Sequence, residues 1–244
     1  MENIIYKSIK QGRPFVYFHT QQVTQDILTR AIASGKSIEL DISYNESLGI
    51  YLGHPLSWYD TYNLPKPEIP NIDKIVQTVK TSEIAVVFDC KDIRVMNKVN
   101  ELVKLFGAER CVLHARINEL AFKPYPQEVP IEPHWEDENL PFNELLQIKE
   151  NTSVPILISC RGLTQTRLNN QSEIIKKIIK VTKSKAVGVS FDLPNYELPQ
   201  KNIIDDLINN AIWPFINIDK VNKKKLPRVY FGISDSLEKA TKAA

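Results

Sequence analysis

The sequence predicts an α/β protein built as a (β/α)8 (TIM) barrel, and three observations support this prediction. Apolar, strand-like runs recur along the 244 residues, with helical segments in most of the gaps between them. The runs are almost continuously apolar, as in parallel strands that are covered on both faces. Eight strand–helix units in roughly 250 residues are what this barrel requires. We see no linker, internal repeat or low-complexity segment, so we expect one barrel domain over residues 1–244.

The predicted elements alternate along the chain. The strands are residues 15–19, 37–42, 84–89, 110–117, 154–160, 186–191, 213–218 and 228–234. The helices are residues 23–35, 71–80 (capped by Asn71), 93–107, 142–151, 172–183, 203–212 and 236–244. A doubly wound open sheet is the alternative, but no glycine-rich strand-to-helix turn supports dinucleotide binding in a chain with only 8 glycines.

Composition excludes several function classes. The net charge of +2 argues against a protein that binds nucleic acid by neutralising phosphates over a broad surface. No apolar run approaches the roughly 18 residues that span a bilayer, and no secretory signal is visible. We therefore expect a cytoplasmic protein, although a mature form whose leader had been removed would look the same. Cys90, Cys111 and Cys160 lie in apolar runs and are too few for a disulfide framework, so we expect them to be buried and reduced.

Polar residues gather at the ends of the predicted strands, where a barrel carries its active site. They are His19, Glu39, Asp41, Asp89, Lys91, His114, Arg116, Arg161, Asp192 and Asn217. Glu39 and Asp41 share a face because they are two residues apart, and Asp89 lies on the next strand, about 4.8 Å away. Three such carboxylates would repel one another without a cation. A bound Mg²⁺ or Ca²⁺ would remove the repulsion, and an all-oxygen set favours these ions over zinc.

The same acids have a second interpretation, in which Lys91, Arg116 and Arg161 neutralise them in a structural ion-pair network. The histidines favour a catalytic site. His19 ends the first strand and His54 follows the second, as a general base and a general acid on opposite sides of a phosphorus would. This pattern indicates phosphoryl chemistry rather than glycosidic chemistry, which needs a carboxylate pair and no metal.

These residues resemble the PLC-like phosphodiesterase superfamily, in particular its glycerophosphodiester phosphodiesterases and sphingomyelinase D-like phospholipases. The resemblance lies in His19, Glu39-x-Asp41, His54 after a glycine, Asp89-x-Lys91, the Ser234-Asp235 pair of "RVYFGISD" and Trp213 of "IWPFIN". It implies Mg²⁺, with Ca²⁺ as the alternative, on Glu39, Asp41 and Asp89. It also implies His19 and His54 as the acid/base pair, Lys91 near the phosphate, Trp213 as a further substrate contact, and a cyclic phosphate product.

The chain departs from this family after both histidines. His19-Thr20-Gln21 stands where the family has His-Arg-Gly, and His54-Pro55 stands where it has His-Asp. We expect Arg116 to supply the missing arginine contact to phosphate, with support of the core as its alternative role.

The expected function is a metal-dependent phosphodiesterase that cleaves a glycerophosphodiester or lysophospholipid-like small molecule. One alternative is a catalytically inactive barrel of the same family that binds a ligand or a partner. The other is a metal-free aldolase or isomerase that uses Lys91 as a Schiff-base lysine, which the nearby acids disfavour. Residues 55–65, with Trp58 and Tyr59, form either a lid or a loop packed on the rim. The five basic residues of 219–228 belong either to a solvated loop or to a weak contact with anionic lipid.

Overall fold

The fold is that of a computed structural model. The structure describes residues 2–11, 16–19, 23–61, 63–91, 93–96, 98–117, 139–140, 147, 154–160, 176, 179, 188–191, 205–207, 209–210, 213–217 and 233–236.

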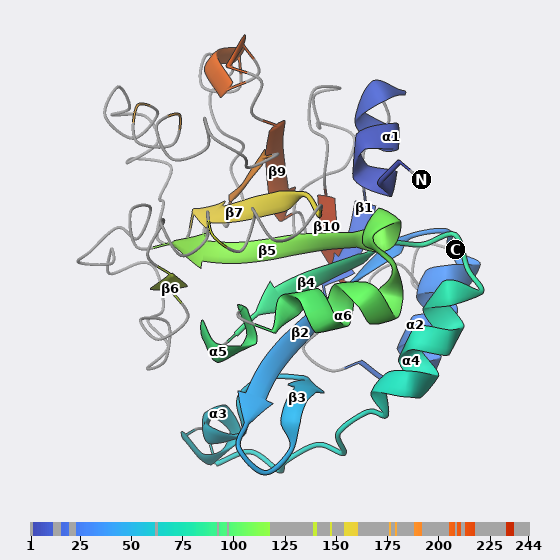
Figure 1. Ribbon diagram of the computed structural model, residues 1–244, viewed down its shortest axis with the longest axis vertical. Coiled ribbons are helices and arrows are strands. Elements are labelled where there is room, and N and C mark those ends of the chain that lie inside the picture. Colours follow the sequence, from blue (N-terminus) through green and yellow to red (C-terminus); the bar gives the residue numbers. More distant parts are fainter. Residues whose placement is uncertain are drawn as a thin grey trace.

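A curled sheet of parallel strands forms the centre of the protein (Figure 1). Its strands are β1 (Val16–His19), β2 (Ser37–Asn45), β4 (Val86–Cys90), β5 (Cys111–Ile117), β7 (Ile156–Cys160), β8 (Gly188–Phe191), β9 (Trp213–Asn217) and β10 (Ile233–Ser236). Each strand pairs in parallel with the next one in this order, from β1 with β2 to β9 with β10, and β10 pairs with β1. The parallel sheet of an α/β barrel is thus confirmed, and the last strand ends two residues later than predicted.

Two short strands were not expected. β3 (Gly49–Leu52) runs antiparallel to the far end of β2, and β6 (Asn139–Leu140) pairs with β5. The predicted strand 37–42 is too short, because β2 continues to Asn45 and turns back as a hairpin. The Asn45 side chain accepts a hydrogen bond from the Ser47 amide (2.9 Å), and Gly49 takes a positive φ of 71° that suits glycine. These local contacts stabilise a turn where the sequence suggested an irregular loop.

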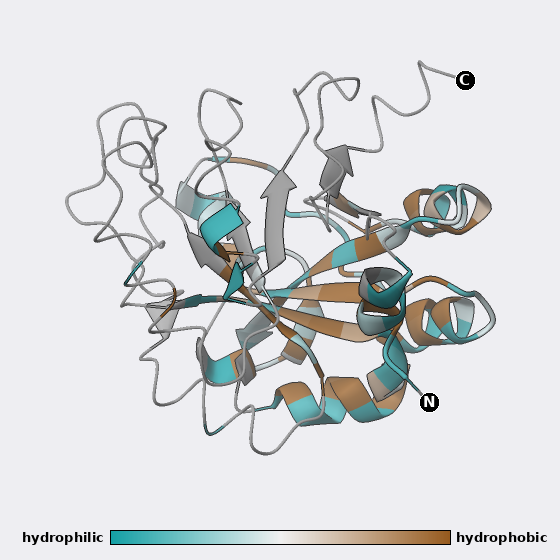
Figure 2. Cartoon of the chain, turned by 90° about the horizontal axis from the view of Figure 1, so that it is seen from above, coloured by the Kyte–Doolittle hydropathy of each residue, from teal (hydrophilic) through white to brown (hydrophobic). Residues whose placement is uncertain are grey.

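Three helices lie outside the first strands of the barrel: α2 (Gln25–Ala33), α4 (Ile72–Lys80) and α6 (Val99–Phe106) (Figure 1). Two begin with side-chain caps, of which the one at Asn71 was predicted. Thr24 Oγ1 accepts from the Ile27 amide (3.2 Å), and Asn71 Oδ1 accepts from the Lys74 amide (3.1 Å). Figure 2 shows these helices with both hydrophobic and hydrophilic stretches around mainly hydrophobic strands, as expected of an outer layer.

The remaining helices differ from the prediction in places. The expected helix 93–107 is divided into α5 (Ile93–Met96) and α6, with Lys98 in a turn between them. The short helices α1 (Ile4–Lys10) and α3 (Leu56–Thr61) and the 3-10 turn η1 (Ala108–Arg110) were not predicted. In the second half, residues 147, 176, 179, 205–207 and 209 are helical and fall within predicted helices. The rest of those helices lies outside the described residues, as does 237–244.

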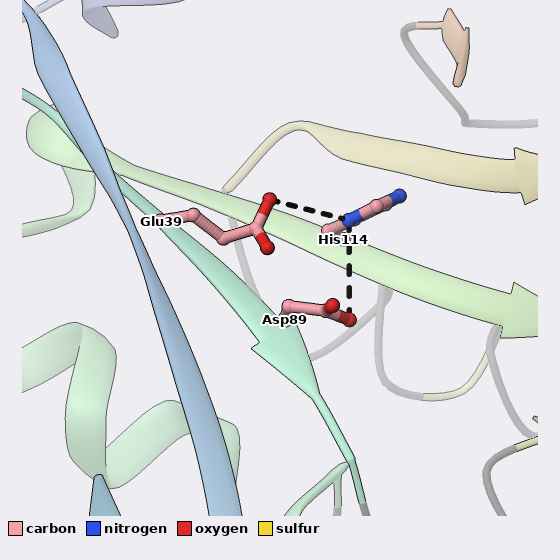
Figure 3. A group of neighbouring side chains, drawn as sticks. All are labelled: Glu39, Asp89 and His114. Atoms are coloured by element: carbon pink, nitrogen blue, oxygen red, sulfur yellow. Dashed lines mark ion pairs between the residues drawn. The ribbon is translucent and has the colours of Figure 1, made fainter. Parts of the chain in front are cut away.

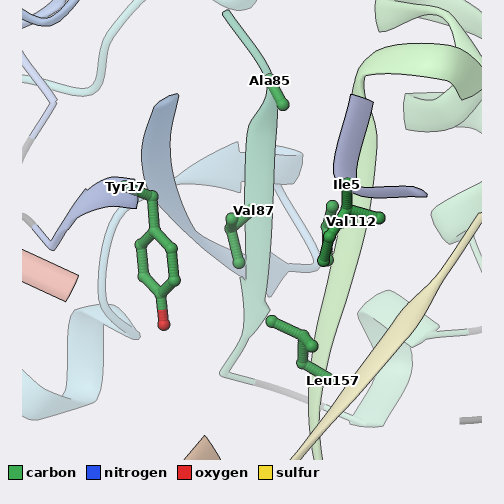
Figure 4. Packing of buried hydrophobic residues seen from close by; sticks show 6 residues of the cluster. All are labelled: Ile5, Tyr17, Ala85, Val87, Val112 and Leu157. Carbon is green, nitrogen blue, oxygen red and sulfur yellow. The ribbon is translucent and has the colours of Figure 1, made fainter. Parts of the chain in front are cut away.

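Helix α1 covers the N-terminal end of the barrel. The Asn3 side chain donates hydrogen bonds to the carbonyls of Ala108 (2.7 Å) and Cys111 (2.8 Å), just before and at the start of β5. Ile5 belongs to a cluster of buried side chains from α1, four strands and the residue before β4, which Figure 4 shows: Tyr17, Ala85, Val87, Val112 and Leu157. Burying each large apolar side chain contributes about 1.5–3 kcal/mol. The described part of this end of the barrel is therefore filled by apolar side chains.

Two of the three cysteines confirm the expectation of buried thiols. Cys90 and Cys111 are buried and form no disulfide, and burial raises the pKa of each thiol, so both are protonated at neutral pH. The side chain of Cys160 lies outside the described residues. Within the described part of the chain, no helix has the length and apolar character needed to cross a membrane.

Candidate active site

Six ionisable residues that lie on three neighbouring strands, β2, β4 and β5, or directly after β4, form one buried cluster. They are Glu39, Asp41, Asp89, Lys91, His114 and Arg116, each at most 5% exposed. The cluster follows from strand geometry. Side chains alternate along a strand, so Asp89 and Lys91 follow the core residue Val87 on the same face of β4. Parallel register then places Asp41, Asp89 and His114 side by side on adjacent strands.

Two cations form ion pairs with two of the three acids of this cluster, Asp41 and Asp89. Lys91 Nζ lies 2.6 Å from Asp89 Oδ2 and 3.3 Å from Asp41 Oδ1. Arg116 Nη2 lies 3.1 Å from the same Asp89 oxygen. Buried charges are costly unless they are paired, so these contacts are what allows the acids to be ionised inside the barrel. Lys91 and Arg116 therefore make the contacts with the acids that the ion-pair interpretation expected, and their substrate-binding role stays a prediction.

Asp41 also holds His54, which lies beyond the hairpin. His54 Nε2 is 2.9 Å from Asp41 Oδ2, so the imidazole donates from this nitrogen. Burial by itself would raise the pKa of Asp41. The Lys91 ammonium and the hydrogen bond from His54 lower this pKa by more than burial raises it, so it lies below its ordinary value. The other ring nitrogen, His54 Nδ1, has no hydrogen-bond partner among the described residues. His54 thus has one nitrogen fixed by a carboxylate and the other available for proton transfer.

The β2–β3 hairpin positions His54. Gly53 donates its amide to the Asp41 carbonyl (2.7 Å) and adopts a φ of 131°, which turns the chain back towards the strand ends. The buried Tyr51 hydroxyl donates to the His54 carbonyl (3.2 Å) and accepts from the Leu56 amide (2.9 Å). The Trp58 ring lies 4.8 Å from the imidazole, between ring centroids. The segment after β3 therefore packs against the site, and half-buried Trp58 contacts His54 directly.

Three donor groups converge at the centre of the cluster, as Figure 3 shows: Glu39, Asp89 and His114. One ligand atom from each lies within 4.8 Å of the others. His114 Nδ1 is 3.9 Å from both Glu39 Oε2 and Asp89 Oδ1. Two carboxylates and an imidazole are a common donor set for divalent cations, so the residues present fit a metal ion. This closely spaced group does not include Asp41, the third ligand expected from the sequence.

The two remaining predicted site residues are described by their backbones. His19 ends β1 in register with Ser236, at the end of the barrel where the cluster lies. Trp213 begins β9 in register with Gly188, four residues before the C-terminal end of that strand. Their predicted roles stay predictions, as do the ligand role of Asp41 and the acid/base role of His54. Other positions raised by the sequence lie outside the described residues: Arg161, Asp192 and the basic segment 219–228.

Sequence reasoning noted His114 at a strand end but gave it no role in the site. The signal was present in the alternation Val112, His114, Arg116 on β5. What the sequence lacked was the register between β4 and β5, which sets His114 beside Asp89.

Comparisons with known proteins support the fold. No protein-family model matches the chain, and no curated protein matches it in sequence. A crystal structure of phosphonopyruvate hydrolase complexed with oxalate and Mg²⁺ is similar, with a TM-score of 0.53 and 11% identity over 100% of this chain and 83% of that one. A mandelate oxidase variant with a monooxide FMN adduct has a TM-score of 0.50 and 7% identity over 92% of this chain and 64% of that one. At these identities the likeness concerns the α/β barrel fold alone.

Proposed function

We propose that the chain is a metal-dependent phosphodiesterase that cleaves a glycerophosphodiester or lysophospholipid-like substrate, with a cyclic phosphate as the first product. One observation carries the proposal: a group of metal-type donors, two cations and a carboxylate-held histidine meet in one buried cluster. Phosphoryl transfer depends mainly on positioning and on stabilising negative charge, and these are the groups that such a reaction uses. The resemblance of His19, Glu39-x-Asp41, His54 and Asp89-x-Lys91 to the PLC-like phosphodiesterases supports the same reaction class.

A divalent cation would be held by Glu39 and Asp89, with Asp41 or His114 as a third donor. When bound, such an ion neutralises charge on the phosphate oxygens. Lys91 and Arg116 add positive charge beside Asp89, and both are fixed by ion pairs before substrate arrives. In a site shielded from water, such fixed charges stabilise a developing negative charge far more than they would in solvent.

His54 would move the proton. Because Asp41 holds Nε2, Nδ1 is the atom that accepts a proton from the attacking hydroxyl or donates one to the leaving alcohol. Asp41 also stabilises the imidazolium that forms when Nδ1 takes up a proton. His19, which ends the neighbouring strand β1, is the proposed partner for the opposite proton transfer.

The contacts of Lys91 disfavour the alternative of a metal-free aldolase or isomerase with a Schiff-base mechanism. A Schiff-base lysine must be neutral to attack a carbonyl. Lys91 Nζ lies within 3.3 Å of two carboxylates, which stabilise the charged ammonium instead.

The test is release of alcohol from a panel of glycerophosphodiesters and lysophospholipids with Mg²⁺, Ca²⁺, Mn²⁺ or a chelator. The variant is His54→Gln, and its matched control is Glu46→Gln, which alters an exposed side chain in the turn of the same hairpin. We expect turnover that requires metal, is lost in His54→Gln and is retained in Glu46→Gln. Stabilisation by metal without turnover would instead indicate a ligand-binding barrel. If the protein shows neither turnover nor stabilisation by metal, the cluster is a structural ion-pair network.

A further inference from the structure

We infer that His114 is a metal ligand, and that the ion is held by two carboxylates and one imidazole from Glu39, Asp89 and His114. This inference rests on the proposed metal-dependent function and deepens it. It replaces the all-oxygen set of Glu39, Asp41 and Asp89 that the sequence suggested, and it changes the class of metal that the site selects.

The spacing of the three donors is the first argument. His114 Nδ1 lies 3.9 Å from one oxygen of each acid. This distance is longer than the 2.7–3.2 Å of an N–H···O hydrogen bond. It is also shorter than the roughly 4.5 Å that separates two groups bridged by one water, whose two hydrogen bonds of about 2.8 Å meet at a near-tetrahedral angle. Two ligands of one ion, each bonded at about 2.0–2.2 Å, lie up to about 4.4 Å apart. A separation of 3.9 Å therefore suits a shared ion.

The second argument is that the two oxygens of Asp89 contact different groups, whereas both oxygens of Asp41 are already in contact with a side chain. Asp89 Oδ2 contacts Lys91 and Arg116, whereas its other oxygen, Oδ1, is the one near His114. Asp89 can thus keep both cation contacts and still provide one oxygen to a metal. Asp41 differs, because Oδ2 contacts His54 and Oδ1 contacts Lys91. If Asp41 bound a metal, it would weaken the contact that orients His54.

The backbone fixes this arrangement in advance. Glu39, Asp89 and His114 lie on three adjacent parallel strands, and Asp89 and His114 are in direct register. All three side chains are at most 7% exposed, so a bound ion would be shielded from bulk water. Ligands placed on strands rather than on loops need little ordering when the metal binds.

An imidazole ligand has a consequence for metal choice. Oxygen-only sites suit Mg²⁺ and Ca²⁺, whereas imidazole nitrogen favours first-row transition ions. Mn²⁺ is accepted by carboxylates and imidazole alike. We therefore expect Mn²⁺ to bind at least about tenfold more tightly than Mg²⁺. Loss of the imidazole should lower Mn²⁺ affinity by about 10–100-fold or more, because even partners of metal ligands have effects of that size.

The experiment uses chelator-stripped protein titrated with Mn²⁺, with pulsed electron paramagnetic resonance to detect coupling to a bound ¹⁴N nucleus. The variant is His114→Gln, and the matched controls are His54→Gln and His19→Gln. We expect nitrogen coupling in the unchanged protein and in both controls, and none in His114→Gln. Labelling the unchanged protein with ¹⁵N-histidine provides a second measurement if His114→Gln fails to fold. The coupling should then change to that of ¹⁵N and persist in both control variants.

Turnover measured on the same samples separates the two proposals. Bound Mn²⁺ with metal-dependent turnover but without histidine nitrogen coupling would overturn the role of His114 and leave the proposed function standing. Coupling that disappears in His54→Gln or His19→Gln instead would likewise overturn it. Failure of Mn²⁺, Mg²⁺ and Ca²⁺ to bind would overturn the metal-dependent function itself.

Discussion

Replacement of Lys91 by methionine probes the energetics of the buried cluster. The change removes an ammonium that lies 2.6 Å from Asp89 and 3.3 Å from Asp41 while keeping a side chain of similar length. With an effective dielectric constant of about 20, the two attractions are about 6 and about 5 kcal/mol before desolvation is subtracted. Removing one partner of a buried ion pair typically costs about 3–5 kcal/mol, because the remaining charge stays buried. We expect Lys91→Met to lower the free energy of unfolding by that amount.

Urea unfolding with chelator and with Mn²⁺ provides the assay, and Lys74→Met on the exposed face of α4 is the matched control. The control should lie within about 0.5 kcal/mol of the unchanged protein. Mn²⁺ should restore part of the unfolding free energy that Lys91→Met loses, because the bound cation offsets the negative charge of Asp41 and Asp89 that Lys91 no longer neutralises. Each tenfold gain in metal affinity adds about 1.4 kcal/mol at saturating metal. An unfolding free energy unchanged within about 0.5 kcal/mol in Lys91→Met would refute this account of the ion pairs.

Three further predictions concern Asp41 in the cluster, Tyr51 beside it and the Asn71 cap of α4, which lies apart from the site. The pKa of folded Asp41 is lowered, so its ionised form contributes stability that is present above its unfolded pKa of about 3.9 and is lost as pH falls through the folded value. Asp41→Asn should therefore flatten the loss of unfolding free energy below about pH 5 in urea titrations, and an unchanged slope would contradict the pairing. Tyr51→Phe removes the hydroxyl that joins the His54 carbonyl to the Leu56 amide, so it should cost about 1–3 kcal/mol of stability and lower kcat at unchanged metal affinity. Asn71→Ala removes the cap of α4 and should cost about 1 kcal/mol in thermal unfolding without altering turnover, which makes it a test of the fold separate from the site.

Strand periodicity explains why much of the site could be predicted. Glu39 and Asp41, like Asp89 and Lys91, are two residues apart in strand-like segments, and this alone places each pair on one face. Parallel neighbours in a barrel then bring the two strands together, and the structure has that pairing. The cap of α4 was likewise a local property of Asn71 and is confirmed, whereas the Thr24 cap of α2 was not predicted.

The contacts chosen within the cluster depend on features that a single sequence does not encode locally. Asp41 contacts His54 because a hairpin with β3 returns the chain to the strand ends, and the four residues of β3 are too short for a periodic signal. His114 meets Asp89 through the register of β4 and β5, which is set by packing along the whole strands. Helix α1 was missed for a similar reason. Its seven residues are stabilised by Ile5 packing on the barrel core rather than by their own helical pattern.

We propose above that the buried cluster holds a divalent ion and that phosphodiester cleavage depends on this ion. The most direct test of this proposal is a titration of chelator-stripped protein with Mn²⁺, in which bound metal and product formation, followed by ³¹P NMR, are measured on the same samples. The account predicts that turnover rises in proportion to bound metal and saturates at one ion per chain. Full turnover by the stripped protein, or no metal bound at any concentration that leaves the protein folded, would contradict it.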